Sequence, residues 1–138
     1  ALAMRRAISD AEISASDIDY INAHGTSTQY NDRTETQAIK IALEEHAYNV
    51  NISSTKSMTG HLAAGAGGIE AVASVLALSN NIIPPTINYD QPDPDCDLRV
   101  TPNEASAVEI RVALSNSFGL GGQNSSAVFK SFESDRVI

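Results

Sequence analysis

The sequence is short of the residue types that mark several protein classes. Tryptophan is absent and cysteine occurs once, at Cys96, so no disulfide can form within the chain and a reducing compartment suits it. The 9 Lys and Arg residues are outnumbered by 17 Asp and Glu, which gives a net charge of −8. Because phosphate contacts need clustered Lys and Arg, nucleic acid is not expected as a partner. No apolar run is long enough to span a bilayer, so no membrane partner is expected either.

The length and the apolar content fit one domain with a substantial core. The chain has 138 residues, of which 42% are hydrophobic, and this suffices for a single domain over residues 1–138. Its first residue, Ala1, already lies in an apparent helical pattern that runs to Ile8. We therefore expect the chain to be part of a longer protein, located in the cytoplasm or in an organelle stroma or matrix.

Helical and strand-like apolar periodicities alternate along the chain. Helices are predicted over 3–12, from Asn31 or Asp32 to about His46, and from Gly60 to about Leu78, and strands over 17–24, 51–55, 108–116 and 125–132. Glu35 stands where a capping box would place it, and the acidic, proline-containing stretch 88–97 is expected to be a loop. The alternation predicts an α/β layered domain with a mixed sheet of four to five strands.

The predicted helix 60–78 carries a single charge, Glu70, and is otherwise apolar on every side. Such a helix is normally buried on most faces, and a buried carboxylate is costly unless it is paired. Lys56 is the only Lys or Arg between Lys40 and Arg99. The sequence therefore predicts a Lys56–Glu70 ion pair, with contact of Glu70 to solvent or to a metal as the alternatives.

Two histidines, His24 and His61, each follow a predicted strand. The carboxyl ends of strands converge on one rim of an α/β sheet, so these two side chains are expected to face a common pocket. Each imidazole can move a proton at neutral pH. At the start of a helix the dipole disfavours imidazolium, so His61 is expected to be a neutral donor to a developing oxyanion. Either histidine alone has a simple structural interpretation.

Three other features have plain structural interpretations. His46 is expected to be a surface residue, and the carboxylates that flank Cys96 raise the pKa of its thiol and make it a poor nucleophile. The glycine-rich segment 118–122 lacks the lysine and the following helix of a nucleotide site, although its backbone N–H groups can face an oxyanion. Metal ligation by the two histidines and Glu70 has no support from ligand spacing.

Several colinear motifs over residues 18–130 resemble the carboxyl-terminal half of the β-ketoacyl-[acyl-carrier-protein] synthases, particularly the synthase II type. The matching stretches are 21–28 (INAHGTST), 31–32 with 35–36, 53–62 (SSTKSMTGHL), 83–88 (IPPTIN), 92–98 (PDPDCDL), and 116–119 (NSFG) with 121, 122 and 124. The resemblance implies the thiolase-like layered α-β-α fold, of which this chain is the carboxyl-terminal half.

The resemblance also implies an acyltransferase that performs a decarboxylative Claisen condensation in fatty acid elongation. In that reaction malonyl-acyl carrier protein loses CO2, and the carbanion attacks an acyl chain held on a cysteine. His24 and His61 match the two catalytic histidines, which support decarboxylation and stabilise the enolate. Lys56 matches the active-site lysine, and Glu70 matches the acid that pairs with it. No cofactor is implied, because the pantetheine arm arrives on the carrier protein.

Further positions match the substrate contacts of the family. Thr26 and Thr28 match threonines that hydrogen-bond the pantetheine arm, while Phe118 and Leu120 match the loop at the acyl pocket. The backbone N–H of Leu120 corresponds to a donor of the oxyanion hole, but the family usually has phenylalanine there, so the aromatic gate is lost. Some members hold a monovalent cation near four positions, which correspond to Asn22, Glu70, Ser115 and Asn116.

The nucleophilic cysteine of the family lies in the amino-terminal half, and Cys96 matches a loop residue instead. The chain alone is therefore expected to be inactive in condensation and poorly stable. The expected partners are acyl carrier protein and a second copy of the full-length synthase in a homodimer. The alternatives are a type II polyketide ketosynthase, a non-catalytic chain-length-determining subunit, and a generic α/β ligand-binding domain.

Overall fold

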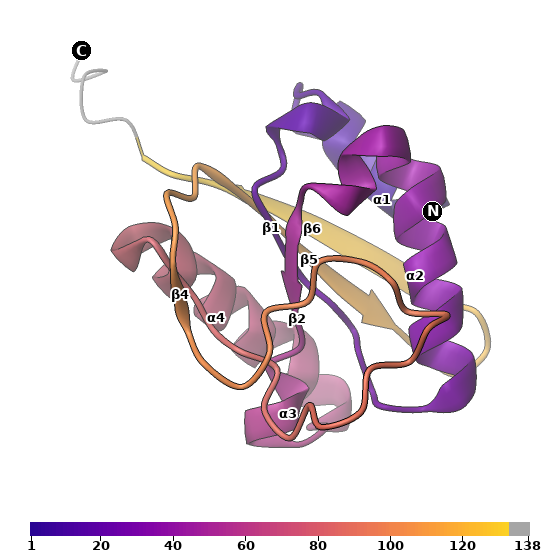
Figure 1. The fold of residues 1–138 in the computed structure, drawn as a ribbon. Coiled ribbons are helices and arrows are strands. Elements are labelled where there is room, and N and C mark those ends of the chain that lie inside the picture. Colours follow the sequence, from indigo (N-terminus) through magenta and orange to yellow (C-terminus); the bar gives the residue numbers. More distant parts are fainter. Residues whose placement is uncertain (133–138) are drawn as a thin grey trace, which may run out of the picture.

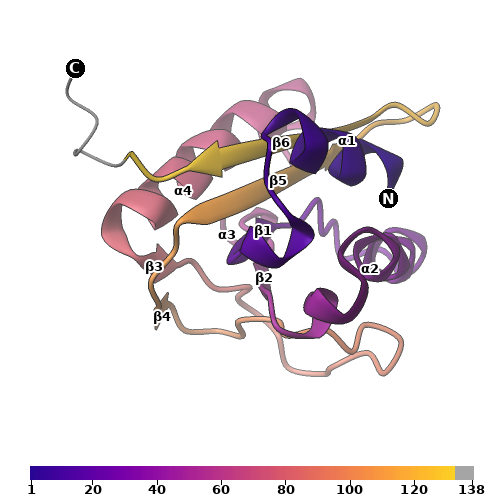
Figure 2. The ribbon, with the colours of Figure 1, turned by 90° about the horizontal axis from the view of Figure 1, so that it is seen from above.

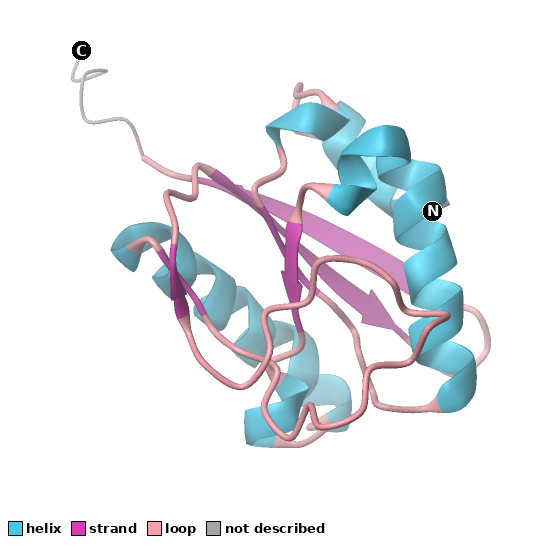
Figure 3. Ribbon diagram, viewed as in Figure 1, coloured by secondary structure: helices cyan, strands magenta, loops and turns pink. Residues whose placement is uncertain are grey.

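A four-stranded mixed sheet forms the centre of the computed structural model, which describes residues 1–132 (Figure 1; Figure 3). The strand order is β2-β1-β5-β6, with β1 parallel to β2 and to β5, and with β5 antiparallel to β6. The strands are β1 (Tyr20–Asn22), β2 (Asn51–Ser53), β5 (Val112–Phe118) and β6 (Asn124–Lys130). The predicted α/β fold with a mixed sheet is confirmed.

Helices cover both faces of this sheet, as Figure 2 shows from above. On one face lie α1 (Leu2–Asp10) and α2 (Gln29–Leu43), and on the other lies α4 (Ala66–Asn80). Alternate side chains of a strand point to opposite faces, so within β1 Ile21 packs in the cluster under α1 and α2, while Tyr20 packs in the cluster under α4. The molecule therefore has three layers and two apolar cores.

Short elements that the sequence did not predict complete the fold. A second, two-stranded sheet pairs β3 (Ile82–Ile83) with β4 (Ser106–Ala107), and an isolated bridge joins Ile52 to Val100 beside β2. The remaining elements are the single-turn helix α3 (Lys56–Thr59) and three 3-10 turns at Ala15–Asp17, Glu44–Tyr48 and Ala63–Gly65. Segments of two to five residues give no clear periodicity, which is why the sequence did not reveal them.

The predicted helix from Gly60 is wrong at its amino-terminal end. Gly60 has φ +73 and ends α3, Ala63 has φ +49, and α4 begins only at Ala66. His61 therefore lies in the connection between α3 and α4. The argument that a helix dipole acts on His61 is wrong for the same reason, because that effect falls off beyond the first turn of a helix.

The predicted start of α2 at Asn31 or Asp32 is also wrong, since the helix begins at Gln29 after Thr28. The helix ends at Leu43, where a 3-10 turn takes over before the predicted end. Glu35 makes no capping box: its side chain is 3% exposed and points inward, under the loop that follows β1.

The outer face of α4 is apolar and exposed. Its inner side packs Ala77 and Leu78 against the sheet, while Ile69, Val72, Val75 and Leu76 are 38–58% exposed on the outer side. The expectation that this helix is buried on most faces is thus wrong for the chain as it stands. No helix within residues 1–132 is both long enough and apolar enough to cross a membrane.

We predict that replacing Val72 and Leu76 together by glutamine lowers self-association of the chain. Both side chains are exposed, so the free energy of unfolding should change by only about 0.5 kcal/mol per site, whereas less apolar surface is left to associate. Light scattering and denaturant unfolding measure the two effects. The matched control is Leu78→Gln, which buries an amide and should cost about 2–4 kcal/mol; unchanged scattering in the double variant would contradict the prediction.

Candidate active site

The imidazoles of His24 and His61 lie against each other. Their ring centroids are 5.3 Å apart, and the planes meet at 85°, edge to face. The Phe118 ring lies on His24 as well, with centroids 5.4 Å apart. The predicted approach of the two histidines is confirmed, with His61 in the α3–α4 connection and His24 in the loop after β1. The expectation that both side chains face one pocket is met only by His61, which lines the pocket described below, whereas His24 does not line it.

The turn that carries His24 is fixed by hydrogen bonds from two elements. The carboxylate of Glu35, on α2, accepts the backbone N–H of His24 at 2.9 Å and of Gly25 at 2.8 Å. The side-chain amides of Asn116 and Asn31 also donate to Glu35, at 3.1 and 3.4 Å. Sequence reasoning missed this role, because Glu35 lies three residues after Asp32, one of the two predicted N-cap residues, which is the spacing of a capping box.

Glycine is the only residue type that fits this turn at position 25. Its φ is +39, a conformation that side chains disfavour. A β-carbon there would lie 2.5 Å from Cβ and 2.7 Å from Oγ of Ser54. The loop after β1 therefore lies directly against the end of β2.

His24 is held in its neutral form. Burial, followed by the positive charge of Lys56 and then the proximity of His61, lowers the pKa of His24 to about 4. Its side chain is 6% exposed, and Nδ1 has no hydrogen-bond partner among residues 1–132. A neutral imidazole can donate through its N–H to an oxygen that gains negative charge, as described for electrophilic histidines.

His61, in contrast, is exposed. Its Nδ1 accepts the backbone N–H of Ala63 at 3.2 Å, so Nδ1 carries no proton and the proton of the neutral ring lies on Nε2. The contact fixes one tautomer, which leaves Nε2–H to face a ligand.

Lys56 and Glu70 form a buried ion pair, as predicted. Lys56 Nζ donates to Glu70 Oε1, and the two side chains are only 4% and 1% exposed. Ser117 Oγ donates to the other carboxylate oxygen at 3.5 Å. The pair joins α3 to α4 beneath the histidines, and its partnership is what makes two buried charges tolerable.

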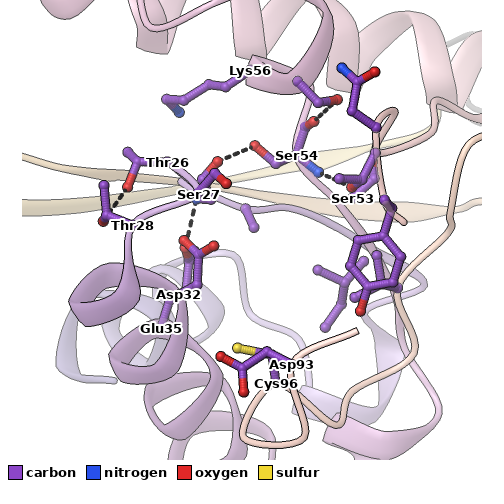
Figure 4. A pocket seen from close by; sticks show the side chains of 18 of the residues that line it. Thr26, Ser27, Thr28, Asp32, Glu35, Ser53, Ser54, Lys56, Asp93 and Cys96 are labelled. Atoms are coloured by element: carbon purple, nitrogen blue, oxygen red, sulfur yellow. Dashed lines mark hydrogen bonds between the residues drawn. The ribbon is translucent and has the colours of Figure 1, made fainter. Parts of the chain in front are cut away.

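A pocket of about 810 Å³ opens beside these groups. Lys56, His61, Thr26 and Thr28 all line it, and the two threonine hydroxyls are 2.9 Å apart. In Figure 4 Lys56 lies at one end of the pocket and Cys96 at the opposite end, with the threonines between them along one side. The predicted pantetheine contacts are therefore in the same pocket as the histidine and lysine.

Ion pairs hold the far wall of the pocket on α2. Arg33 contacts Asp93 and Asp95, each at 3.1 Å, and Lys40 contacts Asp97 at 2.5 Å. The predicted acidic loop, residues 88–97, is thus held against α2 by these ion pairs. The paired residues are about 60 positions apart, and the sequence did not predict the contacts.

The glycine-rich segment forms the β5–β6 turn. Phe118, the last residue of β5, contacts His24, whereas the side chain of Leu120 is fully exposed at the tip. Gly119 N–H donates to the carbonyl of Gln123 at 2.7 Å and closes the turn. The use of the Leu120 N–H in an oxyanion hole stays a prediction.

Three of the four positions proposed for a monovalent cation lie on the α4 face of the sheet. Asn22 and Ser115 are partners in the β1–β5 register, and Asn22 Nδ2 donates to the carbonyl of Glu70 at 3.4 Å. The side chain of Asn116 lies on the opposite face, where it donates to Glu35 of α2. Oxygens of three of these side chains already accept hydrogen bonds: Asn22 Oδ1 from Thr55, Asn116 Oδ1 from Ser126, and the Glu70 carboxylate from Lys56. The cation site stays a prediction on which no step below depends.

Cys96 and His46 have structural rather than chemical roles. Burial, with some contribution from Asp93 and Asp32, raises the pKa of the Cys96 thiol and suppresses its thiolate. His46 is half-buried, and its Nε2 donates to the carbonyl of Ile18 at 2.8 Å. The expectation of a surface histidine at position 46 is therefore wrong in part. Within residues 1–132 no group of three or more His, Cys, Asp or Glu is placed to hold a metal.

We predict that Glu35→Gln destabilises the protein by about 1–3 kcal/mol. Four neighbouring groups donate to the carboxylate, and the glutamine would place its own NH2 donor among them in place of an acceptor oxygen. Denaturant unfolding measures the cost. The matched control is Glu45→Gln, which alters an exposed residue and should be neutral. Equal stability of the two variants would show that Glu35 does not hold the turn.

We predict that His24 makes a contribution to the free energy of unfolding that rises with pH between about 4 and 6.5. The unfolded chain binds a proton at His24 over this window while the folded chain does not, since burial lowers the folded-state pKa to about 4. Glu35, whose pKa is raised by burial, contributes with the opposite sign, so the test compares two proteins. Denaturant unfolding at pH 4.5, 5.5 and 6.5 measures the slope, which should be less positive in His24→Gln than in the wild type; identical slopes would contradict a neutral His24.

Comparison with known proteins places this geometry in a family. Residues 1–90 match the family described as beta-ketoacyl synthase, C-terminal domain. The 3-oxoacyl-[acyl-carrier-protein] synthase 2 of Synechocystis sp. (strain ATCC 27184 / PCC 6803 / Kazusa) is 56% identical over 127 residues, which cover 92% of this chain and 30% of that protein. Nodulation protein E of Rhizobium meliloti is 50% identical over 93% of this chain and 32% of its own length.

Solved structures agree with this result. A type II polyketide synthase acyl-carrier protein in complex with its ketosynthase bound to the hexaketide superposes with a TM-score of 0.91 at 46% identity, covering 94% of this chain and 33% of that one. The ishigamide ketosynthase/chain length factor superposes with a TM-score of 0.90 at 37% identity, covering 94% of this chain and 32% of that one. The chain thus spans about a third of the length of the relatives that it matches. It belongs to the β-ketoacyl synthase family and corresponds to the carboxyl-terminal domain.

Proposed function

We propose that this chain is the histidine- and lysine-bearing part of a 3-oxoacyl-[acyl-carrier-protein] synthase. The observation that carries the proposal is the edge-to-face pair of His24 and His61, 5.3 Å apart, beside the buried Lys56–Glu70 pair. The reaction is a decarboxylative condensation of a malonyl thioester with an acyl thioester in fatty acid elongation, and it needs no cofactor.

The two imidazoles fit the charge that develops in this reaction. When the malonyl C–CO2⁻ bond breaks, its electron pair moves onto the thioester carbonyl and forms an enolate. The N–H groups of His24 and His61 donate to that oxygen, and preorganised donors of this kind are worth about 10²–10³-fold each in rate. The enolate carbon then forms the new C–C bond with the acyl carbonyl, and the cysteine thiolate leaves.

Lys56 serves this chemistry through its charge. The ammonium favours neutral His24, because protonating His24 beside it is unfavourable. Glu70 keeps Lys56 charged and in place within a region that otherwise disfavours charge. Thr26 and Thr28 bind the pantetheine arm at the pocket wall.

The partner that delivers the substrate is an acyl carrier protein. A structural neighbour is a ketosynthase in complex with such a protein, which supports the assignment. Carrier proteins are acidic, and this chain has a net charge of −8, so we propose that docking uses basic surface on other parts of the synthase. The assembled enzyme acts as a homodimer in the cytoplasm or in an organelle stroma or matrix.

A second function comes from the structural neighbours. Two of them are polyketide proteins, a type II ketosynthase and a ketosynthase/chain length factor. A type II polyketide ketosynthase would use the same histidines, whereas a non-catalytic chain-length-determining subunit would lack the cysteine. The residue at the nucleophile position of the longer protein distinguishes the non-catalytic subunit from the fatty acid synthase and the polyketide ketosynthase, because only the two enzymes have cysteine there.

The test uses the full-length synthase with malonyl- and acyl-carrier protein. His24→Ala and Lys56→Ala should each lower the rate of CO2 release about 10²-fold or more, while acyl transfer to the cysteine survives. Lys130→Ala, which removes an exposed lysine, is the matched control and should keep full activity. Normal CO2 release in His24→Ala would sink the proposal. The 138-residue chain alone should give no ketoacyl product.

A further inference from the structure

Ser54 makes hydrogen bonds to three neighbouring segments at once. Its Oγ donates to the carbonyl of Gly25 at 2.8 Å, and its backbone N–H donates to Thr86 Oγ1 at 2.9 Å. Its carbonyl accepts Ser57 Oγ at 2.9 Å and the N–H of Ser57 at 3.2 Å. Ser54 is 7% exposed, directly follows β2 and lines the pocket, and Figure 4 shows it across from Thr26 and Thr28.

The contact with Gly25 completes the restraint on the catalytic turn. Glu35 holds this turn by its N–H groups, on the α2 side. Ser54 holds it by a carbonyl, from the opposite side, and fits so closely that no β-carbon could stand at position 25. The N–H and the carbonyl of Gly25 belong to the two peptide units on either side of its Cα, so neither unit can rotate without breaking a hydrogen bond.

The same residue starts the segment that carries Lys56. The bonds from Ser57 to the Ser54 carbonyl form the first turn that leads into α3. Ser54 thus ties the loop of His24 to the helix of Lys56, and it does so beyond the Asn22–Thr55 and Ala23–Ser53 hydrogen bonds that join the ends of β1 and β2. It is the contact of this set that reaches past His24 to Gly25, where small displacements matter in catalysis.

We propose that Ser54 is a positioning residue that sets the orientation of His24 relative to Lys56. It touches no reacting atom. In Ser54→Ala the Gly25 carbonyl loses its donor, the turn rotates, and the buried imidazole becomes more accessible to water. The role in turnover rests on the proposed function, whereas the effect on the turn does not.

The experiment follows His24 by NMR in the protein that carries this chain, with its signal assigned through His24→Gln. In Ser54→Ala the pKa of His24 should rise from about 4 by roughly one unit, toward its usual value, because burial weakens. Amide exchange at Gly25 should quicken about tenfold or more. In the active synthase kcat should fall about 10–100-fold, with KM for malonyl-carrier protein changed less than about twofold.

The matched control is Ser79→Ala. It removes a hydroxyl that donates to a backbone carbonyl at the same range, 2.9 Å, but far along α4, and it should leave His24 unchanged. Ser54→Cys keeps a weak donor and should give intermediate shifts; it decides the question if Ser54→Ala does not fold. Titration of His24 and exchange of Gly25 as in the wild type would overturn the proposal. A wild-type protein without condensation activity overturns the proposed function alone, since the NMR readouts remain.

Discussion

A buried ammonium–carboxylate pair is the constraint on which the rest of the site depends. Lys56 and Glu70 cannot be desolvated separately at tolerable cost, so burying either one requires the other. Their contact fixes α3 to α4 across a connection that is otherwise irregular, and His61 lies in that connection. The geometry of the exposed histidine therefore follows from a charge pair beneath it. Burial lowers the pKa of His24, and the same ammonium lowers it further, so the pair contributes to protonation as well as to position.

Much of this arrangement was predictable because the sequence offered few alternatives. Glu70 is the only charge on an apolar helix and Lys56 the only nearby cation, so their pairing followed from counting. The approach of His24 to His61 followed from the rule that strand ends share one rim. The amino-terminal boundary of α4 was not predictable, because a segment of glycine and alanine can form a helix, a 3-10 turn or a turn with a residue in the left-handed conformation. The role of Glu35 was not predicted, since three of its four donors lie 10 to 81 residues away in the sequence.

The family assignment and the physical analysis support each other at different levels. The match of residues 1–90 to the family establishes membership, and identity of 56% over 92% of the chain agrees with it, but neither says how the residues act. The contacts supply that account: a neutral buried imidazole, a second imidazole of fixed tautomer, and a lysine held by a glutamate. The outer side of α4 is apolar and exposed in this chain, which spans about a third of the length of its relatives.

The fit of Gly25 against Ser54 has an evolutionary consequence. With 2.5 Å between an imagined β-carbon and that of the serine, the two positions share one small space. A larger side chain at either place must be compensated at the other, so substitutions should be inherited jointly, as a coordinated pair. Drift at the end of β2 is thereby limited by a turn almost thirty residues earlier, and selection on catalysis reaches a serine that touches no reacting atom.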